Sequence, residues 1–228
     1  MKTALVIAAH PDDEVLGCGG TIAKMADEGW DVHVLILAEG ATSRLDHRDR
    51  ELKFEDISEL ERCAQAAGKI LGTRSVTLET FADNRMDGVE MLEVVKRIEQ
   101  EIRRFRPERV LTHQNSDVNI DHRVVHDSVV AAVRPFPGAI TRELLFFEVP
   151  SSTEWRPPAS MRQFAPNMFV DISIALERKL EALALYKSEL HAFPHPRSIV
   201  AVNHLARWRG ASVGFEAAEA FEIGRLLA

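Results

Sequence analysis

Residues 3–14 read TALVIAAHPDDE, and this stretch decides the fold. Its first part, residues 3–9, is a continuous apolar run, which is typical of a strand buried on both faces of a parallel sheet. A polar turn with one histidine and three acidic residues follows. Residues 15–28 then carry apolar side chains at helical spacing up to Gly29, which ends the predicted helix. The stretch therefore predicts a strand, a polar loop and a helix, which is the opening unit of an α/β fold.

The same alternation of strand and helix continues through the first 133 residues. Three further strands are predicted at 31–38, 75–81 and 109–112. Three further helices are predicted between and after them, at 52–71, 91–105 and 121–133. An acidic residue, Asp121, opens the last of these helices and suits an N-cap. Strands that alternate with helices form a parallel sheet with right-handed crossovers. The pattern predicts a doubly wound, mostly parallel α/β sheet.

Beyond Pro135 the pattern is less regular. Two strands are predicted there, at 144–149 and 168–172, with a long polar loop at 151–166 between them. A helix is predicted at 174–190. We expect a single domain over residues 1–228, with a core at 1–134. The C-terminal part, 135–228, is expected to add strands and to complete the walls of the site.

The composition is that of an ordinary globular protein with a mild excess of acid. The chain has 228 residues, 46% of them hydrophobic, and a formal net charge of −7. Such a protein has no electrostatic reason to bind nucleic acid or an anionic membrane. We also expect no membrane span and no signal peptide. The two cysteines, Cys18 and Cys63, cannot form a disulfide framework, and a cytoplasmic protein is therefore expected. The sequence leaves a homo-oligomer open.

Two clusters of histidine and aspartate follow predicted strands. HPDDE at 10–14 follows the first strand, and HQNSDVNIDH at 113–122 follows the fourth. The carboxyl ends of parallel strands are where ligands gather in an open sheet. Imidazole and carboxylate are the donors of hydrolytic zinc sites, and of two adjacent carboxylates one can bind metal while the other transfers protons. HPDDE alone could equally be a helix start capped by Asp12 or Asp13. The pairing of the clusters favours a metal-dependent hydrolase.

Other residues near these clusters have less specific interpretations. His126 shares a helix face with His122, but packing in the helix is favoured for it. For His113 a hydrogen-bonding role and a metal role are both open. The turn GCGG at 17–20 could belong to a nucleotide-binding module, but the acids before it would repel a pyrophosphate. Close packing of the helix on the sheet is the favoured role of these glycines, and Cys18 is expected to be a small buried residue.

Four residues are candidates for binding a polar substrate. Asp83 and Arg85 follow the third predicted strand and could bind hydroxyl groups. His195 and Arg197 lie in a loop bracketed by prolines, and rigid loops often present binding groups. A plain surface turn is the alternative for each pair.

These motifs resemble those of the LmbE-like, or PIG-L, family of zinc-dependent N-deacetylases. The matching segments are AHPDDE, LGCGGT, TH, DVNIDHR, RP, RG and AEAF, at 9–14, 16–21, 112–113, 117–123, 134–135, 209–210 and 218–221. The resemblance implies a Rossmann-like fold. It also implies a substrate that is an N-acetylated amino sugar or its conjugate, free or nucleotide-linked.

The resemblance further implies the roles of individual residues. By position, the Zn²⁺ ligands would be His10, Asp13 and His122, and the general base would be Asp12. The residues alone do not distinguish the role of Asp12 from that of Asp13. Asp121 is expected to orient the imidazoles of the site as a hydrogen-bond acceptor.

The chain departs from the family at Asn119. Many members have a histidine at this place, three residues before the last ligand, that steadies the oxyanion. An asparagine amide can donate a hydrogen bond but cannot become cationic. Either Asn119 performs a weaker version of this role, or His195 or His113 takes part.

The predicted reaction is zinc-dependent hydrolysis of an acetamide, which yields acetate and a free amino sugar. Two alternatives remain. The first is a zinc amidase that acts on a non-sugar acetamide. The second is a non-catalytic protein that binds a sugar or a nucleotide.

Overall fold

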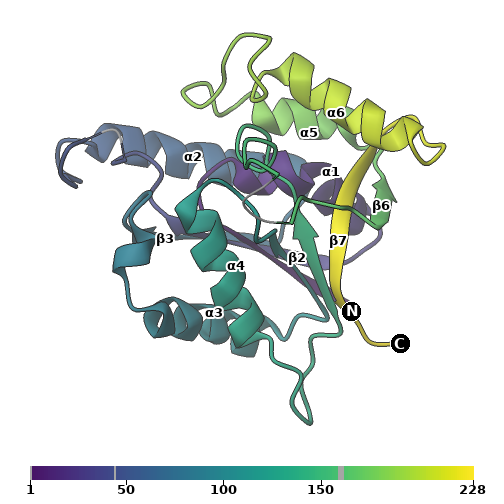
Figure 1. The fold of residues 1–228 in the computed structure, drawn as a ribbon, viewed down its shortest axis with the longest axis horizontal. Helices are drawn as coiled ribbons and strands as arrows, with labels where there is room; N and C mark the ends of the chain where they lie inside the picture. Colours follow the sequence, from purple (N-terminus) through teal and green to yellow (C-terminus); the bar gives the residue numbers. More distant parts are fainter. Residues whose placement is uncertain (1, 44, 159–161) are drawn as a thin grey trace.

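A seven-stranded, mostly parallel sheet forms the centre of the molecule (Figure 1). The computed structural model describes residues 2–43, 45–158 and 162–228. In chain order the strands are β1 (Thr3–Ala8), β2 (Asp31–Ala38), β3 (Ser75–Phe81), β4 (Arg109–His113), β5 (Glu143–Phe147), β6 (Met168–Asp171) and β7 (Ala218–Leu226). Their order in the sheet is β3-β2-β1-β4-β5-β7-β6. β7 runs antiparallel to its neighbours β5 and β6, and the other pairs are parallel.

Helices cover both faces of this sheet. They are α1 (Asp13–Asp27), α2 (Phe54–Leu71), the short 3₁₀ helix η1 (Met86–Gly88), α3 (Met91–Phe105), α4 (Ile120–Ala132), α5 (Leu176–Leu183) and α6 (Ile199–Ala211). Helices α3 and α4 pack on one face, whereas α1, α2 and α5 pack on the other, with α6 against α5 and β7 (Figure 1). The doubly wound α/β fold predicted from the sequence is therefore confirmed. Within the described residues, no helix has the length and apolarity that a bilayer crossing requires.

The apolar run of β1 serves two hydrophobic cores at once. Val6 and Ala8 point into the core under α1, α2 and α5, whereas Leu5 and Ile7 point into the core under α3 and α4. Alternate side chains of a strand face opposite sides of the sheet, so a strand covered on both sides needs apolar residues at every position. The run ends where the polar turn at His10 begins.

The C-terminal part contributes to the same sheet. The strands predicted at 144–149 and 168–172 correspond to β5 and β6, whereas α6 and β7 were not predicted. The predicted loop at 151–166 has no helix or strand in its described residues, and 159–161 lie outside the description. Strand β7 buries the acid Glu219 and carries Gly224 in its second half, and the pattern of apolar residues therefore does not reveal it.

The helix predicted at 174–190 is wrong in its second half, because α5 ends at Leu183. Beyond it the chain turns inward. Tyr186 is fully buried, and its hydroxyl donates to Oε1 of Glu14 at 2.6 Å. The thiol of Cys63 donates to the carbonyl of Leu185 at 3.2 Å, so this carbonyl needs no helical partner. These long-range contacts outweigh the helical spacing of the segment.

Helix α1 is kinked at Cys18, whose φ of −150° is not helical. The freed backbone groups are bound by two buried charged residues. Lys179 of α5 donates to the carbonyl of Leu16 at 2.9 Å, and Glu219 of β7 accepts from the N–H groups of Gly20 and Thr21 at 2.9 and 2.7 Å. Nζ of Lys179 also lies 2.5 Å from Oε1 of Glu219. This ion pair connects α1, α5 and β7.

The packing role predicted for the glycine-rich turn is confirmed. A Cβ atom on Gly17 would overlap the ring of Phe147 in β5, and one on Gly20 would lie 2.8 Å from Cδ1 of Ile172. Cys18 is a fully buried small residue, as expected. The glycines therefore allow α1 to approach the sheet closely.

Candidate metal centre

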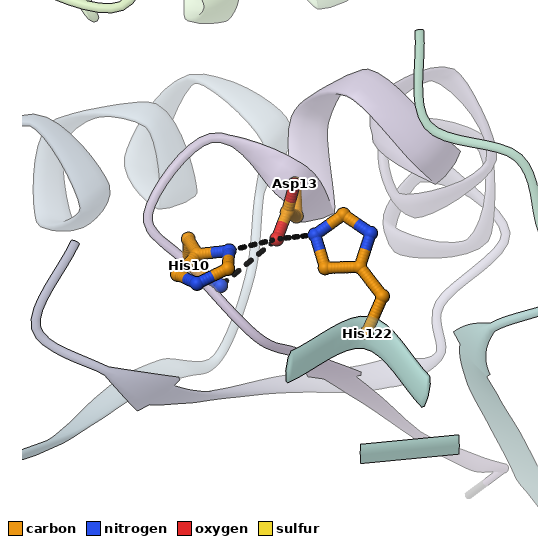
Figure 2. Close-up of side chains that lie close together, drawn as sticks. All are labelled: His10, Asp13 and His122. Carbon is orange, nitrogen blue, oxygen red and sulfur yellow. Dashed lines mark hydrogen bonds and ion pairs between the residues drawn. The ribbon is translucent and has the colours of Figure 1, made fainter. Parts of the chain in front are cut away.

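The two histidine and aspartate clusters meet at the carboxyl edge of the sheet. His10 lies in the turn after β1, Asp13 is the first residue of α1, and His122 lies in the first turn of α4. Figure 2 shows the carboxylate of Asp13 between the two imidazole rings. Its Oδ2 lies 3.2 Å from Nδ1 of His10 and 3.2 Å from Nε2 of His122. All three side chains are buried.

Each of the two imidazole rings also contacts a further aspartate through its second nitrogen. Nε2 of His10 lies 3.0 Å from Oδ2 of Asp121, and Nδ1 of His122 lies 3.0 Å from Oδ2 of Asp117. A ring that donates its N–H to such a carboxylate presents the lone pair of its other nitrogen. In both rings that nitrogen faces Asp13. A lone pair that faces a carboxylate requires a proton or a metal cation between them.

The charges of the site agree with this arrangement. Burial alone would lower the pKa of His122, but the carboxylates of Asp13 and Asp117 raise it to about 9. Burial opposes the charge on His10 too, yet hydrogen bonds to Asp121 and Asp13 raise the pKa of its imidazole well above the ordinary value. Burial would raise the pKa of Asp13, but the two histidines hold it well below the usual range. The carboxylates therefore favour a positive charge at the centre.

Unpaired buried atoms also point to this centre. Oδ1 of Asp13 and Oδ1 of Asp12 are buried without a hydrogen-bond partner among the described residues, and Nε2 of His122 has only its ion-pair contact with Oδ2 of Asp13. Buried polar atoms are rarely left unpaired, because each one costs free energy. A cation held by His10, Asp13 and His122 would give the ring nitrogen and the Asp13 oxygen a partner. The site is thus a histidine and aspartate cluster that is able to bind a metal.

Asp83 and Asp121 form a second group of possible ligands with His10. Oδ1 of Asp83 lies 3.3 Å from Nε2 of His10. The oxygens of Asp121 already accept from the N–H groups of Asn84 and Met86, at 2.6 and 2.9 Å. Hydrogen bonds therefore account for this group, and Asp121 makes the contact with His10 that its predicted orienting role requires.

Asp12 lies beside the metal centre in an unusual backbone conformation, with φ of 108°. Its N–H donates to Oε2 of Glu14 at 3.1 Å, and Glu14 is held in turn by Tyr186. Oδ2 of Asp12 accepts from Nη1 of Arg197 at 3.1 Å. Burial raises the pKa of Asp12 well above its ordinary value, although Arg197 opposes this shift. Asp12 makes no capping hydrogen bond, and Oδ2 of Asp13 accepts from His10, so the capping interpretation of HPDDE is wrong.

Of the two roles left open for His113, hydrogen bonding and metal binding, its contacts fit hydrogen bonding. Its Nε2 accepts the N–H of Ala9 at 2.8 Å, which uses the lone pair that a metal would need. Its ring stacks on His122, with centroids 4.0 Å apart. His126 donates from Nδ1 to the carbonyl of His113 at 2.8 Å and packs on Phe146, so its role is structural, as favoured from the sequence.

Asn119, and not Asp121, is the N-cap of α4. Its Oδ1 accepts from the N–H of Asp121 at 2.8 Å. The N-cap prediction for Asp121 is wrong because that carboxylate faces His10 instead. No described residue accepts from the amide nitrogen of Asn119. The catalytic role of Asn119 stays a prediction.

The four candidate substrate residues lie in different surroundings. Asp83 is buried next to His10, and Arg197 reaches Asp12. His195 does not contact the metal centre, and its Nδ1 accepts from the N–H of Arg197 at 3.1 Å. Arg85 is exposed and donates to backbone carbonyls of the loop after β2, at 3.1 and 3.2 Å. Their roles in binding stay predictions.

Sequence reasoning missed three residues that hold the site. Asp117 supports His122 and accepts from Ser152 and Thr153, and it lies inside the quoted cluster, five residues before the ligand. Glu14 and Tyr186 support Asp12. Tyr186 is the only tyrosine of the chain, but no sequence signal links it to residues at the other end.

Known proteins resemble this chain in sequence and fold. The sequence profile of the PIG-L family, described as GlcNAc-PI de-N-acetylase, matches residues 5–133. A diacetylchitobiose deacetylase from Thermococcus kodakarensis is 32% identical over 196 residues, which are 83% of this chain and 70% of that protein. A 4-oxalmesaconate hydratase from Pseudomonas putida is 29% identical over 211 residues, covering 85% of this chain and 76% of that protein. The crystal structure of a conserved protein from Thermus thermophilus superposes with a TM-score of 0.77 at 27% identity, covering 100% of this chain and 97% of that one.

Proposed function

Because this chain belongs to the PIG-L family of GlcNAc-PI de-N-acetylases, we propose that it is a zinc-dependent hydrolase that removes the acetyl group from an N-acetylated amino sugar or its conjugate. The products are acetate and the free amine. The observation that carries this proposal is the buried set of His10, Asp13 and His122, with one unpaired oxygen of Asp12 beside it.

Zinc is the proposed ion because two imidazoles and one carboxylate are the donor set of catalytic zinc sites. Nδ1 of His10, Asp13 and Nε2 of His122 would hold it, and Asp121 and Asp117 would fix the two rings. When bound, zinc would lower the pKa of a water molecule and polarise the acetamide carbonyl.

Asp12 is the proposed general base. Its Oδ2 is held by Arg197, so Oδ1 is the oxygen left to take a proton from the attacking water. The same carboxyl then delivers this proton to the nitrogen of the leaving amine. The amide nitrogen of Asn119 donates to the developing oxyanion, more weakly than a cationic histidine would.

The sugar is bound around this centre by residues that the sequence already indicates. Asp83 is proposed to accept a hydrogen bond from a sugar hydroxyl, which would have to replace the N–H of Ser43 or the side-chain amide of Asn84, each now 3.0 Å from an Asp83 oxygen. Arg85, His195 and Arg197 are the other proposed binding residues. Arg85 would have to leave its backbone partners in the loop after β2 to reach a sugar.

An acetate-release assay tests the proposal. Purified protein with its zinc content measured is incubated with N-acetylglucosamine, diacetylchitobiose, a nucleotide-linked N-acetylglucosamine and simple acetamides. We expect one zinc per chain and acetate from at least one sugar. Acetate from simple acetamides alone would indicate the non-sugar amidase. A bound nucleotide without zinc would indicate a binding module, and hydration of 4-oxalmesaconate without acetate release would place the chain with the hydratase relative.

A further inference from the structure

Two loops of the C-terminal part bring three aromatic rings together. Trp155 lies in the loop after β5, and His191 and His195 lie in the loop between α5 and α6. The rings of Trp155 and His195 are nearly perpendicular, with centroids 5.7 Å apart, and the centroids of His191 and His195 are 4.2 Å apart. We call these three residues the aromatic rim.

Arg197 joins this rim to the site. Its Nε donates to Oγ of Ser151 at 2.7 Å, which ties the two loops together. Its backbone N–H donates to Nδ1 of His195, and its Nη1 donates to Asp12. A single residue therefore separates the rim from the proposed base. A ligand with its acetamide at Asp12 that extends past Arg197 would therefore reach the rim.

Trp155 is a large apolar side chain that the protein itself leaves uncovered. It is 52% exposed, and its indole N–H has no partner among the described residues. Trp30 is different, because the charged groups of Lys2 and Arg109 lie over its ring, at 5.1 and 4.6 Å from the centroid. No described ring or cation stacks in parallel on Trp155. Its indole face is therefore available to a ligand.

The chemistry of the rim favours a sugar ring. The guanidinium of Arg197 next to it is engaged by Asp12 and Ser151, and Arg156, which follows Trp155 in the chain, has a buried Nε without a hydrogen-bond partner among the described residues. Slight burial and the charges of His191 and Arg197 lower the pKa of His195. A pyranose ring can place its C–H face on the indole and its hydroxyl groups near the imidazoles.

We propose that the aromatic rim binds the second sugar ring of a disaccharide whose first ring carries the acetamide at Asp12. This inference rests on the proposed function for the position of the first ring. It assigns to Trp155 a role in substrate choice and none in bond cleavage. An interaction of this kind stabilises the bound substrate and the transition state equally, so it changes KM and leaves kcat unaltered.

Steady-state acetate release from diacetylchitobiose and from N-acetylglucosamine tests the rim. In Trp155→Ala the KM for the disaccharide should rise about tenfold, whereas the KM for the monosaccharide should stay within about twofold. Trp155→Phe should recover most of the loss. Trp208→Ala is the matched control, because Trp208 is 69% exposed on α6 and has no ring partner in the described chain. Equal effects on both substrates, or none, would overturn the proposal.

A binding measurement separates this proposal from the proposed function. Calorimetric titration of the zinc-loaded Asp12→Asn protein with diacetylchitobiose should give an affinity that falls about tenfold when Trp155→Ala is added. Absence of acetate release from the wild-type protein would contradict the proposed hydrolase activity. The titration would still show whether the aromatic rim binds the disaccharide. Unchanged affinity would overturn it. A change in oligomeric state of Trp155→Ala would also overturn it, because the ring would then belong to an interface between chains.

Discussion

Nη1 of Arg197 lies 3.1 Å from Oδ2 of Asp12, so a residue near the C-terminus holds an acid from the first turn after β1. The contact occupies one oxygen of the carboxylate and leaves Oδ1 buried and unpaired next to the metal centre. Asp12 is fixed at its backbone as well, where its N–H donates to Glu14. The proposed base is therefore oriented by Arg197 from the C-terminal part and by Glu14 from the N-terminal part of the chain.

Replacing Arg197 by glutamine should lower kcat for acetate release by about a hundredfold, because a misplaced catalytic group costs about that much. Zinc content should not change, since Arg197 does not contact the three ligands. Arg207→Gln is the control, because Arg207 is an exposed residue of α6 that bonds to Asn203. A rise in KM at constant kcat would show that Arg197 acts in sugar binding alone and does not orient Asp12.

Asp12→Asn should retain zinc and lose turnover by a factor of about 10² to 10⁴, which is the usual contribution of a positioned acid or base. The amide keeps the shape of the side chain but cannot accept the proton. Parallel measurements of bound zinc and of acetate release check this. Normal turnover by the zinc-loaded variant would show that another group is the base.

His10→Ala should lose both bound zinc and activity, because Nδ1 of His10 is one of three proposed donors. Asp121→Asn should weaken zinc binding about 10- to 100-fold, as is common for residues that orient a ligand. A competition titration with a metal chelator gives the two affinities, and thermal unfolding verifies that the variants fold. Stoichiometric, tightly held zinc in His10→Ala would contradict the ligand set.

Lys179→Met should lower the free energy of unfolding by about 3–5 kcal/mol, because it leaves the buried carboxylate of Glu219 without its partner. The double variant Lys179→Met with Glu219→Gln should be less destabilised, since no buried charge remains. Chemical denaturation measures both. Lys24→Met is the control, because Lys24 forms an exposed ion pair with Glu28, and it should change stability by less than about 1 kcal/mol.

The carboxylate of Glu39 should make folding stability depend on pH. Burial opposes its ionisation, but hydrogen bonds from Arg48 and Thr42 and the charges of Arg48 and Arg50 lower its pKa below the ordinary 4.5. A lowered folded-state pKa stabilises the protein above the unfolded value, and this contribution is lost as the pH falls through the folded value. The stability difference between wild type and Glu39→Gln should therefore be constant at neutral pH and shrink below about pH 4.5. A difference that stays constant down to about pH 3 would contradict this.

Local pattern was enough for the first half of the fold. The strands at 31–38 and 75–81 and the helix at 91–105 were predicted with the bounds that the structure has. In each of these elements the spacing of the apolar residues reflects which of its faces are buried, and this spacing can be read from the sequence. The helix at 174–190 failed because Tyr186 leaves the helical path to reach Glu14, 172 residues away. The spacing of apolar residues along the chain does not reveal such a long-range contact.

Apolar runs and turns are local properties of the chain, so the sequence alone places His10, Asp13 and His122 after strands of a parallel sheet, whereas the structure shows that these strands, β1 and β4, are neighbours. The sequence could not determine which oxygen of Asp12 is free, that Asn119 caps α4, or that Asp117 holds His122. Tertiary structure decided these, since they depend on the direction of side chains in a shared buried space. The contact between Arg197 and Asp12 belongs to the same class, because folding alone brings residues 185 positions apart within hydrogen-bond distance.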